Sequence, residues 1–404
     1  MGARDLDIVI AGGGLVGPVL ALVLAGQGFQ VALLDRIDPA TRTAPGFDGR
    51  AYAVALGSAR VLGSVGLWDG LEARAQEIGR IQVGEGKGSP ALLTFDPAAT
   101  DEGRVGWILE DHLLRRALAE ALRTSGIPEI APAEVAAARF EGPAAELSLA
   151  DGASLRARLA VAADGRRSTL ATLGGVRRVE WSYAQTGLVN AIEHAEPHGG
   201  LAHQSFFPGG PFAVLPLPGQ RSSIVWSEDR RRAETLMGLD EARFTSELRA
   251  RIGPRLGAIR LAAPRIAHPL NLSLAERFAA PRLALLGDAA HGVHPIAGQG
   301  MNLGLRDVAA LAEVLLEARG RGEDIGDLRV LQRYERWRRF DAVSFALGMD
   351  ALNRLFSNGI GPLSAVRQAG LSAVDHLPAV KRHLMREATG QAGTVPRLLR
   401  GEPL

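Results

Sequence analysis

The chain has 404 residues, of which 47% are hydrophobic, so it is long and apolar enough to build two or three domains around a sizeable core. Its 46 basic and 44 acidic residues nearly balance, which leaves no electrostatic signature of a nucleic-acid partner. Cysteine is absent, so disulfides, cysteine-ligated zinc, iron–sulfur clusters and thiol catalysis are excluded, and no metal centre is predicted.

An uncharged run extends from Ile8 to Leu34 and has the length of a membrane-spanning helix. Its content argues against that interpretation, because six glycines and Pro18 lie within it. Asp5 and Asp7 precede it, where a signal peptide would carry positive charge. We therefore expect neither a membrane span nor a signal peptide, and a protein that is soluble or peripheral to a membrane.

The same run has the pattern of a dinucleotide-binding unit. An apolar stretch at residues 7–11 is typical of a buried strand, and Gly12, Gly14 and Gly17 follow it in the spacing G-x-G-x-x-G. Gly12 permits a tight turn, Gly14 lets the backbone approach a pyrophosphate, and Gly17 lets the next helix pack on the strand. A second apolar strand ends at Asp35, whose carboxylate can accept hydrogen bonds from a ribose. The unit predicts a dinucleotide site without distinguishing NAD from FAD.

The middle of the chain changes from alternating helices and strands to strands alone. Ser58 is predicted to cap a short helix, and residues 110–125 have the spacing of an amphipathic helix. Residues 159–163 have the pattern of a buried strand that ends at Asp164. Several strands then occupy residues 186–226, with Pro-Gly turns between them. This part predicts an antiparallel sheet inserted as a second domain into the first.

A second candidate cofactor contact lies in the last third of the chain. A buried strand at residues 283–286 leads to Gly287 and Asp288, and a Gly-Gln-Gly turn then opens a helix. Asp288 can hold a polyol hydroxyl, and the backbone of residues 298–302 can meet a flat polar ring. On the residues alone, Asp288 could equally cap a helix, and His294 fits a packed loop histidine better than a catalytic one.

Taken in order, these motifs resemble the flavin-dependent aromatic hydroxylases typified by p-hydroxybenzoate hydroxylase. Within that class the chain is most similar to the UbiH/UbiF/VisC family of ubiquinone biosynthesis, and the resemblance covers nearly its whole length. The most specific segment is residues 287–307, GDAAHGVHPIAGQGMNLGLRD. The other matching segments are residues 12–17, 47–50, 109–115, 163–168 and 215–218.

The resemblance implies an α/β protein with a Rossmann-type FAD-binding domain, an inserted and mainly antiparallel β-sheet substrate domain, and a C-terminal helical region. The FAD-binding domain would comprise residues 1–75, 107–180 and 276–345. The substrate domain would comprise residues 76–106 and 181–275, and the helical region residues 346–404.

The resemblance also implies FAD as the cofactor, with roles carried over residue by residue. The glycines of the G-x-G-x-x-G turn would hold the pyrophosphate, Asp35 the adenine-side ribose and Asp288 the ribityl chain. Asp164 belongs to a DG motif that the family links to FAD and to the nicotinamide cofactor. The remaining predicted contacts are Arg50 and Glu110 with FAD, Val135 with the adenine end, and Pro295, Gly298, Gln299, Gly300, Met301 and Asn302 with the isoalloxazine edge.

The implied activity is that of an FAD-dependent monooxygenase. One oxygen atom of O2 would enter an electron-rich phenolic ring, with NADPH or NADH as a transient electron donor. The implied substrate is a polyprenylated intermediate of ubiquinone biosynthesis, and other proteins of that pathway are candidate partners. No catalytic side chain can be named from the sequence. Two alternatives stay open: a hydroxylase of a soluble aromatic compound, and a flavin-bearing assembly subunit of a biosynthetic complex.

The C-terminal region suggests a contact with a membrane. Residues 367–404 contain six basic and three acidic residues, and Lys381, Arg382 and Arg386 would face an anionic leaflet. We predict a cytoplasmic protein that contacts the inner face of the membrane peripherally through this region. The alternative is a helix packed on the FAD-binding domain with an ordinary solvated face. The predicted apolar helical face comprises Leu363, Val366, Leu371 and Val374.

Overall fold

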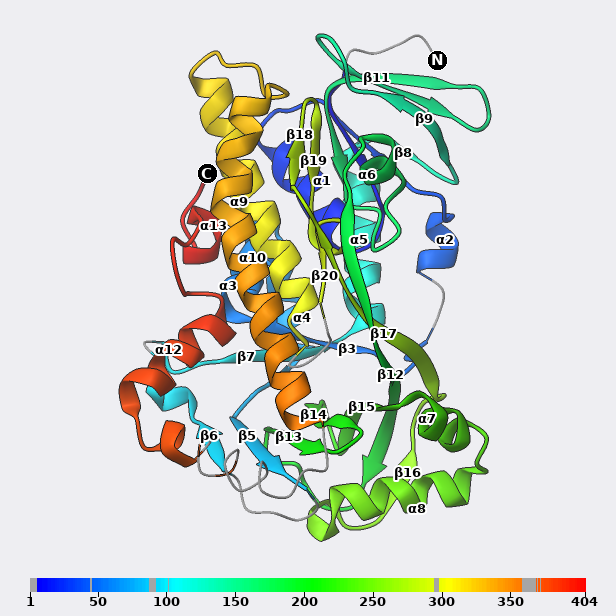
Figure 1. Cartoon of the computed structure of the whole chain (residues 1–404), viewed down its shortest axis with the longest axis vertical. Coiled ribbons are helices and arrows are strands. Elements are labelled where there is room, and N and C mark those ends of the chain that lie inside the picture. The colour runs from blue at the N-terminus through cyan, green and yellow to red at the C-terminus, as the bar shows by residue number, and fades with distance from the viewer. Residues whose placement is uncertain are drawn as a thin grey trace.

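The computed structural model describes residues 6–43, 46–86, 92–100, 102–293, 298–357, 368, 370 and 372–404. Two sheets occupy opposite ends of the molecule (Figure 1). The upper lobe in Figure 1 holds a largely parallel sheet with its helices, and the lower lobe holds a mainly antiparallel sheet. The predicted fold class, an α/β protein with an inserted sheet and a helical C-terminal region, is confirmed.

The upper sheet has eight strands among the described residues, in the order β18-β19-β11-β1-β2-β8, with β9 and β10 forming a hairpin beside β11. The neighbours β19, β11, β1 and β2 run parallel to one another. Their apolar residues are buried, as expected for the central strands of a parallel sheet. The bounds are β1 (Leu6–Ala11), β2 (Val31–Leu34), β8 (Glu129–Ile130), β9 (Val135–Arg139), β10 (Ala145–Leu149), β11 (Ser154–Ala162), β18 (Ala279–Ala280) and β19 (Leu283–Leu285).

Helix α1 follows β1 almost directly, packs on β1 and β2, and contacts both α5 and α9. Pro18 is the third residue of α1, where a missing N–H removes no helical hydrogen bond. Helix α5 confirms the predicted amphipathic pattern, and Gly126 ends it in the left-handed conformation with φ of 73°. The helices of this lobe are α1 (Val16–Gly26), α2 (Pro39–Arg42), α3 (Leu56–Ser64), α4 (Trp68–Glu72), α5 (Asp111–Ser125), α6 (Thr169–Leu173) and α9 (Gly300–Gly320).

A small sheet of β3 (Ala51–Ala55), β7 (Gly106–Glu110) and β4 (Gln76–Glu77) lies where the two lobes meet. The prediction that Ser58 caps the following helix is wrong, because α3 begins at Leu56 and buries Ser58 within it. The turn from β3 into α3 is held from outside, since Asn302 Oδ1 accepts a hydrogen bond from Ala55 N at 3.1 Å. A contact distant in sequence therefore sets this helix start.

The lower sheet has nine strands among the described residues, in the order β20-β17-β12-β15-β14-β13-β5-β6, with β16 beside β12. Only the β13–β5 pair among them is parallel. Helices α7 and α8 cover the part of the sheet where Phe212, Trp226 and Phe244 form a separate core. The bounds are β5 (Arg80–Glu85), β6 (Leu93–Phe95), β12 (Arg178–His194), β13 (Leu201–Phe207), β14 (Gly210–Leu217), β15 (Arg221–Asp229), α7 (Arg230–Met237), α8 (Glu241–Ile252), β16 (Ile259–Leu261), β17 (Ile266–Ala275) and β20 (His291–Gly292).

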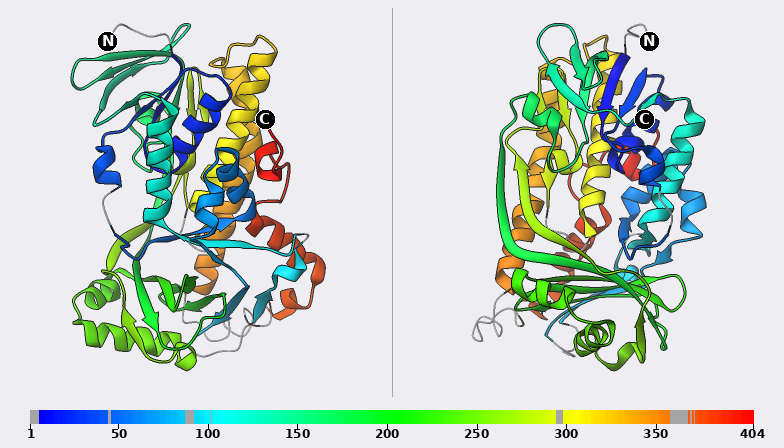
Figure 2. Two further views of the ribbon diagram at one scale, coloured as in Figure 1. Left: turned by 180° about the vertical axis from the view of Figure 1, so that it is seen from behind. Right: turned by 90° about the vertical axis from the view of Figure 1, so that its right-hand side faces the viewer.

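Three long elements join the lobes, namely β12, β17 and helix α10 (Leu328–Phe356), as the two views in Figure 2 show. In the upper lobe, Tyr334 Oη of α10 donates a hydrogen bond to Leu285 O at 2.7 Å. In the lower lobe, Phe356 stacks on Phe206 with ring centres 4.4 Å apart. Helix α10 is therefore fixed at both of its ends.

Toward the C-terminus the described residues include α12 (Pro378–Thr389) and α13 (Arg397–Arg400), and α13 packs on α3 and α9. Within the described ranges, no helix combines the length and the apolar content needed to cross a bilayer. The domain limits inferred from the sequence stay predictions. Strands β5 and β6 belong to the lower sheet, and so does β20, which lies in a stretch assigned to the FAD-binding domain.

Candidate active site

Four predicted contacts come together at one edge of the upper sheet. The strands β19, β11, β1 and β2 are neighbours and run parallel, so their carboxyl ends share this edge. Asp288, Asp164, Gly12 and Asp35 follow these strands in that order across the sheet. Open α/β sheets bind their ligands outside the carboxyl ends of the strands, so the edge is the candidate cofactor site.

The first glycine turn has the shape that a pyrophosphate requires. A Cβ on Gly12 would lie 2.1 Å from Ala163 O, and one on Gly17 would lie 2.0 Å from Gly12 O, so both positions exclude side chains. Gly14 is exposed, and a Cβ there would meet no heavy atom of the described residues within 4 Å. The α1 N-terminus beyond it has no side-chain cap in the described part of the chain. Its free N–H groups can therefore receive an anion.

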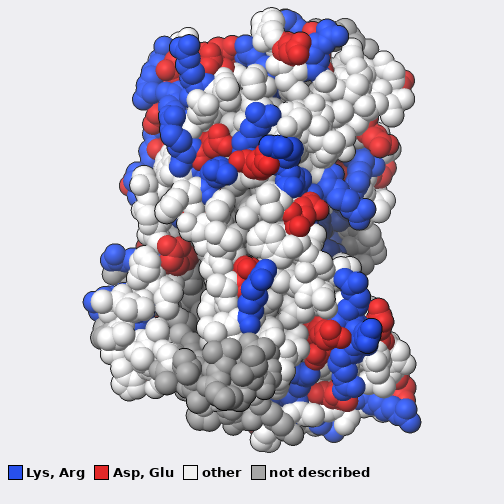
Figure 3. Space-filling model, viewed as in Figure 1, with Lys and Arg blue, Asp and Glu red and all other residues white. Residues whose placement is uncertain are grey.

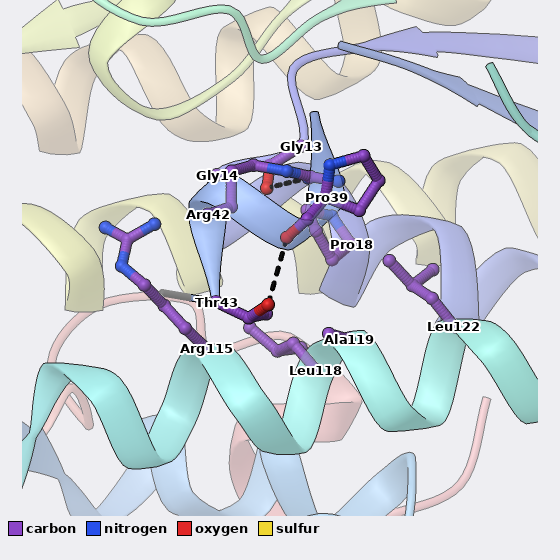
Figure 4. A pocket seen from close by; sticks show the side chains of 10 residues that line it. All are labelled: Gly13, Gly14, Pro18, Pro39, Arg42, Thr43, Arg115, Leu118, Ala119 and Leu122. Atoms are coloured by element: carbon purple, nitrogen blue, oxygen red, sulfur yellow. Dashed lines mark hydrogen bonds between the residues drawn. The ribbon is translucent and has the colours of Figure 1, made fainter. Parts of the chain in front are cut away.

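A pocket lies directly against this turn (Figure 4). Arg42 donates a hydrogen bond to Gly13 O on one side, and Arg115 of α5 contributes a second cation. The carboxylate of Asp35 accepts hydrogen bonds from Gly13 N and, at 2.6 Å, from Ile37 N. Two guanidinium groups and a carboxylate beside the turn fit a phosphate and a ribose hydroxyl. The pocket is lined by Gly13, Gly14, Pro18, Pro39, Arg42, Thr43, Arg115, Leu118, Ala119 and Leu122.

Asp164 combines a structural role with an unused acceptor. Its Oδ2 accepts hydrogen bonds from Thr169 N at 2.8 Å and Leu170 N at 3.3 Å, at the start of α6. Its Oδ1 is buried and has no hydrogen-bond partner within the described ranges. Burial raises the pKa of this carboxyl, although hydrogen bonds from Ser168 and the backbone oppose the shift. A buried acceptor without a donor is rare in proteins, so this oxygen fits a hydroxyl of a bound cofactor.

Asp288 lies in a single turn at residues 287–289 and is paired with an arginine that the sequence analysis missed. Arg166 Nε donates to Asp288 Oδ2 at 3.0 Å, and Arg166 Nη1 and Nη2 reach Asn271 Oδ1 at 2.6 Å and Val293 O at 3.0 Å. Arg166 thus connects the DG motif, the Asp288 turn and strand β17. Because Arg166 directly follows Asp164 and Gly165, its position in the sequence could have marked it as a residue of the candidate site.

Arg50, Asp48 and Asp111 form a charged cluster at the junction of the lobes. Arg50 Nη2 lies 2.7 Å from Asp48 Oδ2 and 3.1 Å from the buried Asp111 Oδ2. Burial lowers the pKa of His268 on β17, and the positive charges of Arg50 and Arg166 lower it further. His268 therefore lies within electrostatic reach of both Arg50 and Arg166.

Glu110 and Val135 have other partners in the structure. The buried carboxylate of Glu110 lies 2.7 Å from Arg221 of β15, and Val135 is buried in the main core. The segment before Val135 does contact the residue proposed to bind the ribose, since Ala133 N donates a hydrogen bond to Asp35 O at 2.7 Å. Contacts of Glu110 and Val135 with FAD stay predictions.

At the start of α9, the buried and the half-buried members of residues 298–302 have different roles. Asn302 is buried, and its Nδ2 donates to Ala53 O at 2.8 Å, so its side chain ties α9 to β3. Met301 is buried too. Gly298, Gln299 and Gly300 are half-buried, which leaves their backbone as the predicted ring contact. His294 and Pro295 lie outside the described residues.

The comparisons with known proteins identify the family. The profile of a family described as FAD binding domain matches residues 5–343. A protein of Rhodospirillum rubrum named ubiquinone hydroxylase UbiL is 44% identical over 402 residues, covering 98% of this chain and 93% of its own. This chain belongs to that family of FAD-dependent hydroxylases. This chain is also 35% identical over 393 residues to the 3-demethoxyubiquinol 3-hydroxylase of Escherichia coli, and the match covers 96% of this chain and 99% of the Escherichia coli protein.

Several solved structures share the fold of this chain. The p-nitrophenol 4-monooxygenase PnpA of Pseudomonas putida DLL-E4 has a TM-score of 0.80 at 23% identity, covering 97% of this chain and 99% of its own. Klebsiella pneumoniae HpxO, solved with FAD and uric acid, has a TM-score of 0.75 at 17% identity, covering 94% and 96%. These likenesses agree with the architecture expected from the sequence.

The predicted enzyme class and the FAD requirement are thereby confirmed. Bound FAD, reduced by a nicotinamide cofactor, supplies the chemistry that activates O2 for insertion into an aromatic ring. The donor set at the carboxyl edge fits this cofactor, because it offers N–H groups and cations for phosphate and carboxylates for hydroxyls. Among the described residues, no group of three or more His, Asp or Glu side chains is arranged to hold a metal ion.

Proposed function

We propose that this hydroxylase acts on a polyprenylated phenol of ubiquinone biosynthesis. The observation that carries the proposal is the nearly full-length similarity to relatives named for ubiquinone hydroxylation, at 44% and 35% identity. The similarity includes the lower sheet as well as the FAD-binding segments. A phenolic ring is electron-rich and needs no protein nucleophile, so the chain has to orient the ring and exclude water.

The cofactor contacts form the second part of the proposal. The turn at Gly12, Gly14 and Gly17 binds the pyrophosphate, Asp35 binds the adenine-side ribose, and Asp288 binds the ribityl chain. Their common position at one sheet edge supports this assignment. The half-exposed carboxylate of Asp288 remains accessible beside Arg166.

The substrate assignment is tested with the purified holoenzyme and isotopically labelled O2. We expect a 2-polyprenylphenol in detergent micelles to accelerate NADPH or NADH oxidation, and mass analysis to find one labelled oxygen atom in the product. Acceleration by 4-hydroxybenzoate or p-nitrophenol alone would contradict the proposal and favour a soluble substrate. A flavin-loaded protein that hydroxylates none of these phenols would favour the assembly-subunit alternative.

A peripheral membrane contact is also proposed, and α12 supplies its support. This helix packs inward through the buried Met385, yet Val380 is 40% and Leu384 is 38% exposed on the outside. Arg382 and Arg386 are also exposed on this helix. In Figure 3 the surface at the lower left, where Figure 1 places α12, is mostly uncharged, whereas charges crowd over α7 and α8. A helix that exposes both apolar side chains and arginines suits an anionic bilayer.

Two parts of the original membrane prediction change in the light of the structure. Leu363, Val366 and Leu371 lie outside the described residues, so the predicted apolar face cannot be placed. Lys381 is paired with Asp375, with Nζ 2.8 Å from Oδ1, so its charge is partly neutralised within the protein. The exposed apolar side chains of α12 are therefore the better target for substitution.

The membrane test compares two variants in which exposed apolar residues are replaced. Val380→Asp combined with Leu384→Asp should reduce sedimentation with anionic vesicles, whereas Val179→Asp should not, although Val179 is 51% exposed on β12. FAD content should stay equal in all variants. Equal sedimentation of the wild type and the α12 variant at low salt would contradict a membrane role for this helix.

A further inference from the structure

A buried cluster on α9 and α10 lies directly behind the turn that carries Asp288. Asp307 of α9 and Arg338 of α10 have fully buried side chains, at 0% exposure, and Arg338 Nε donates to Asp307 Oδ1 at 2.8 Å. His291, also fully buried, donates through Nε2 to Asp307 Oδ2 at 2.6 Å. None of these three side chains reaches the surface, so none can contact a substrate in solution directly.

The carboxylate of Asp307 also binds the backbone of the turn. Its Oδ2 accepts a hydrogen bond from Gly287 N at 3.0 Å, and Gly287 is the residue immediately before Asp288. Gly287 has φ of +54° and lies against Val16, since an added Cβ would be 3.4 Å from Val16 Cγ2. The turn is therefore held on its inner side by one carboxylate and by the start of α1.

The same carboxylate belongs to the helix that begins at the predicted ring contact. Asp307 lies near the start of α9, whose first residues follow Gly298 and Gln299. Through Gly287, Asp307 thus fixes the Asp288 turn relative to residues 298–302. Arg338 in turn anchors Asp307 to α10 and also reaches Asp341 Oδ2 at 3.0 Å.

The negative charge of the buried Asp307 carboxylate is compensated by its neighbours. Burial alone would raise the pKa of Asp307, but electrostatic attraction to His291 and Arg338 and their hydrogen bonds lower it below its usual value. A buried carboxylate is tolerated when it is paired and hydrogen-bonded. Asp307 therefore stays an acceptor for Gly287 N at neutral pH.

We propose that Asp307, oriented by Arg338 and His291, is a positioning residue that sets Asp288 for the ribityl chain of FAD and fixes it relative to the ring-binding start of α9. The proposal rests on the assignment of Asp288 made above. The alternative is that the cluster only stabilises the fold.

The lower sheet contains a matched control. Glu228 is also buried, and it accepts hydrogen bonds from a backbone N–H, a ring N–H and an arginine, as Asp307 does. Its donors are Asp229 N at 3.2 Å, Trp226 Nε1 at 3.2 Å and Arg251 Nη2 at 2.6 Å. None of these residues belongs to the proposed cofactor site, so the control reports the effect of losing a buried ion pair away from that site.

The test uses charge-neutral double variants, because removal of one partner would strand a buried charge. Asp307→Leu with Arg338→Met should raise the FAD dissociation constant, measured by flavin fluorescence, by about 10–100-fold, the range seen when residues that orient a ligand are removed from metal sites. The absorption bands of the remaining bound flavin should shift as well. Glu228→Leu with Arg251→Met should leave FAD affinity at the wild-type value. Wild-type FAD affinity in the folded Asp307 double variant would overturn the proposal.

Adding Asp288→Ala separates this proposal from the assignment on which it rests. If Asp307 acts through Asp288, the two losses of affinity are not additive. Full additivity would overturn the positioning role, whereas wild-type FAD affinity in Asp288→Ala alone would refute the ribityl assignment and the positioning role with it. Arg338→Lys keeps the buried cation and serves if the double variant does not fold. It should also weaken FAD binding, and wild-type FAD affinity in this variant would overturn the proposal.

Discussion

Two glycines of the first turn give a matched pair of substitutions, Gly12→Ala and Gly14→Ala. At Gly12, φ is +120° and an added Cβ would lie 2.1 Å from Ala163 O. At Gly14, an added Cβ would have no described heavy atom within 4 Å, and this glycine is exposed at the proposed pyrophosphate contact. The first substitution should damage the fold, and the second should damage only FAD binding.

The expected magnitudes follow from these surroundings. For Gly12→Ala, a side chain at positive φ costs about 1–3 kcal/mol, and overpacking adds about 1–3 kcal/mol. For Gly14→Ala, the reduced freedom of the unfolded chain stabilises the FAD-free protein by about 0.4–1 kcal/mol. A Cβ at the pyrophosphate contact would displace one charge-assisted hydrogen bond, worth about 1.5–3 kcal/mol, which is about 10–100-fold in the FAD dissociation constant.

Urea unfolding of the FAD-free proteins, followed by circular dichroism, measures the first effect, and FAD titration by fluorescence measures the second. A wild-type FAD dissociation constant in Gly14→Ala would refute the placement of the pyrophosphate. A wild-type urea midpoint in Gly12→Ala would refute the close contact with Ala163. Because the two residues belong to one turn, each variant is the control for the other.

Four further substitutions test other parts of the structure. Arg50→Ala and Asp288→Ala should each lower the affinity for FAD by about tenfold, because each removes a charged partner, and both variants should lose flavin on gel filtration. Stoichiometric flavin in both variants would contradict these assignments. Trp226→Ala should lower the free energy of unfolding by about 3–5 kcal/mol, since its ring is buried in the lower sheet, and an unchanged urea midpoint would count against this packing. Burial lowers the pKa of His203 from 6.5 to about 4. The group is neutral in both the folded and the unfolded state above pH 6.5, so the free energy of unfolding should fall, by at most about 3 kcal/mol, as the pH drops from 6.5 toward 4. His203→Gln should flatten the slope of urea midpoints over that range, and an unchanged slope would assign it to another group.

The parts of the fold that follow local patterns could be predicted from the sequence. Residues 7–35 form the predicted strand, turn, helix and strand, because apolar runs and glycine spacing act over short distances. Helix α5 is another example, since the amphipathic spacing of residues 110–125 predicted it. Four acidic or glycine positions of the candidate site were recognisable because each comes shortly after the end of a buried strand.

The remaining features depend on partners far apart in the chain. The contact of Asn302 with the flavin edge stays a prediction, but the sequence did not show that its side chain binds Ala53 and Ala55, on a strand about 250 residues earlier. Ser58 failed as a cap because that same asparagine fixes the turn before it. Arg166 and Asp307 occur inside segments that resembled the family, yet only the folded chain shows what their side chains hold. Local periodicity contains no information on such contacts.

Helix α10 has a mechanical consequence for the whole enzyme. With 29 residues at 1.5 Å per residue, it is a rod of about 43 Å that is pinned to Leu285 near one end and to Phe206 at the other. Domains that are joined by a single flexible linker can rotate about a hinge, but here a braced rod and two continuous strands cross the same junction. Rotation of one lobe against the other would have to bend α10 or tear it from an anchor. We therefore expect the route by which the aromatic substrate enters and leaves to open through local rearrangement at the surface, while the two lobes keep a constant spacing.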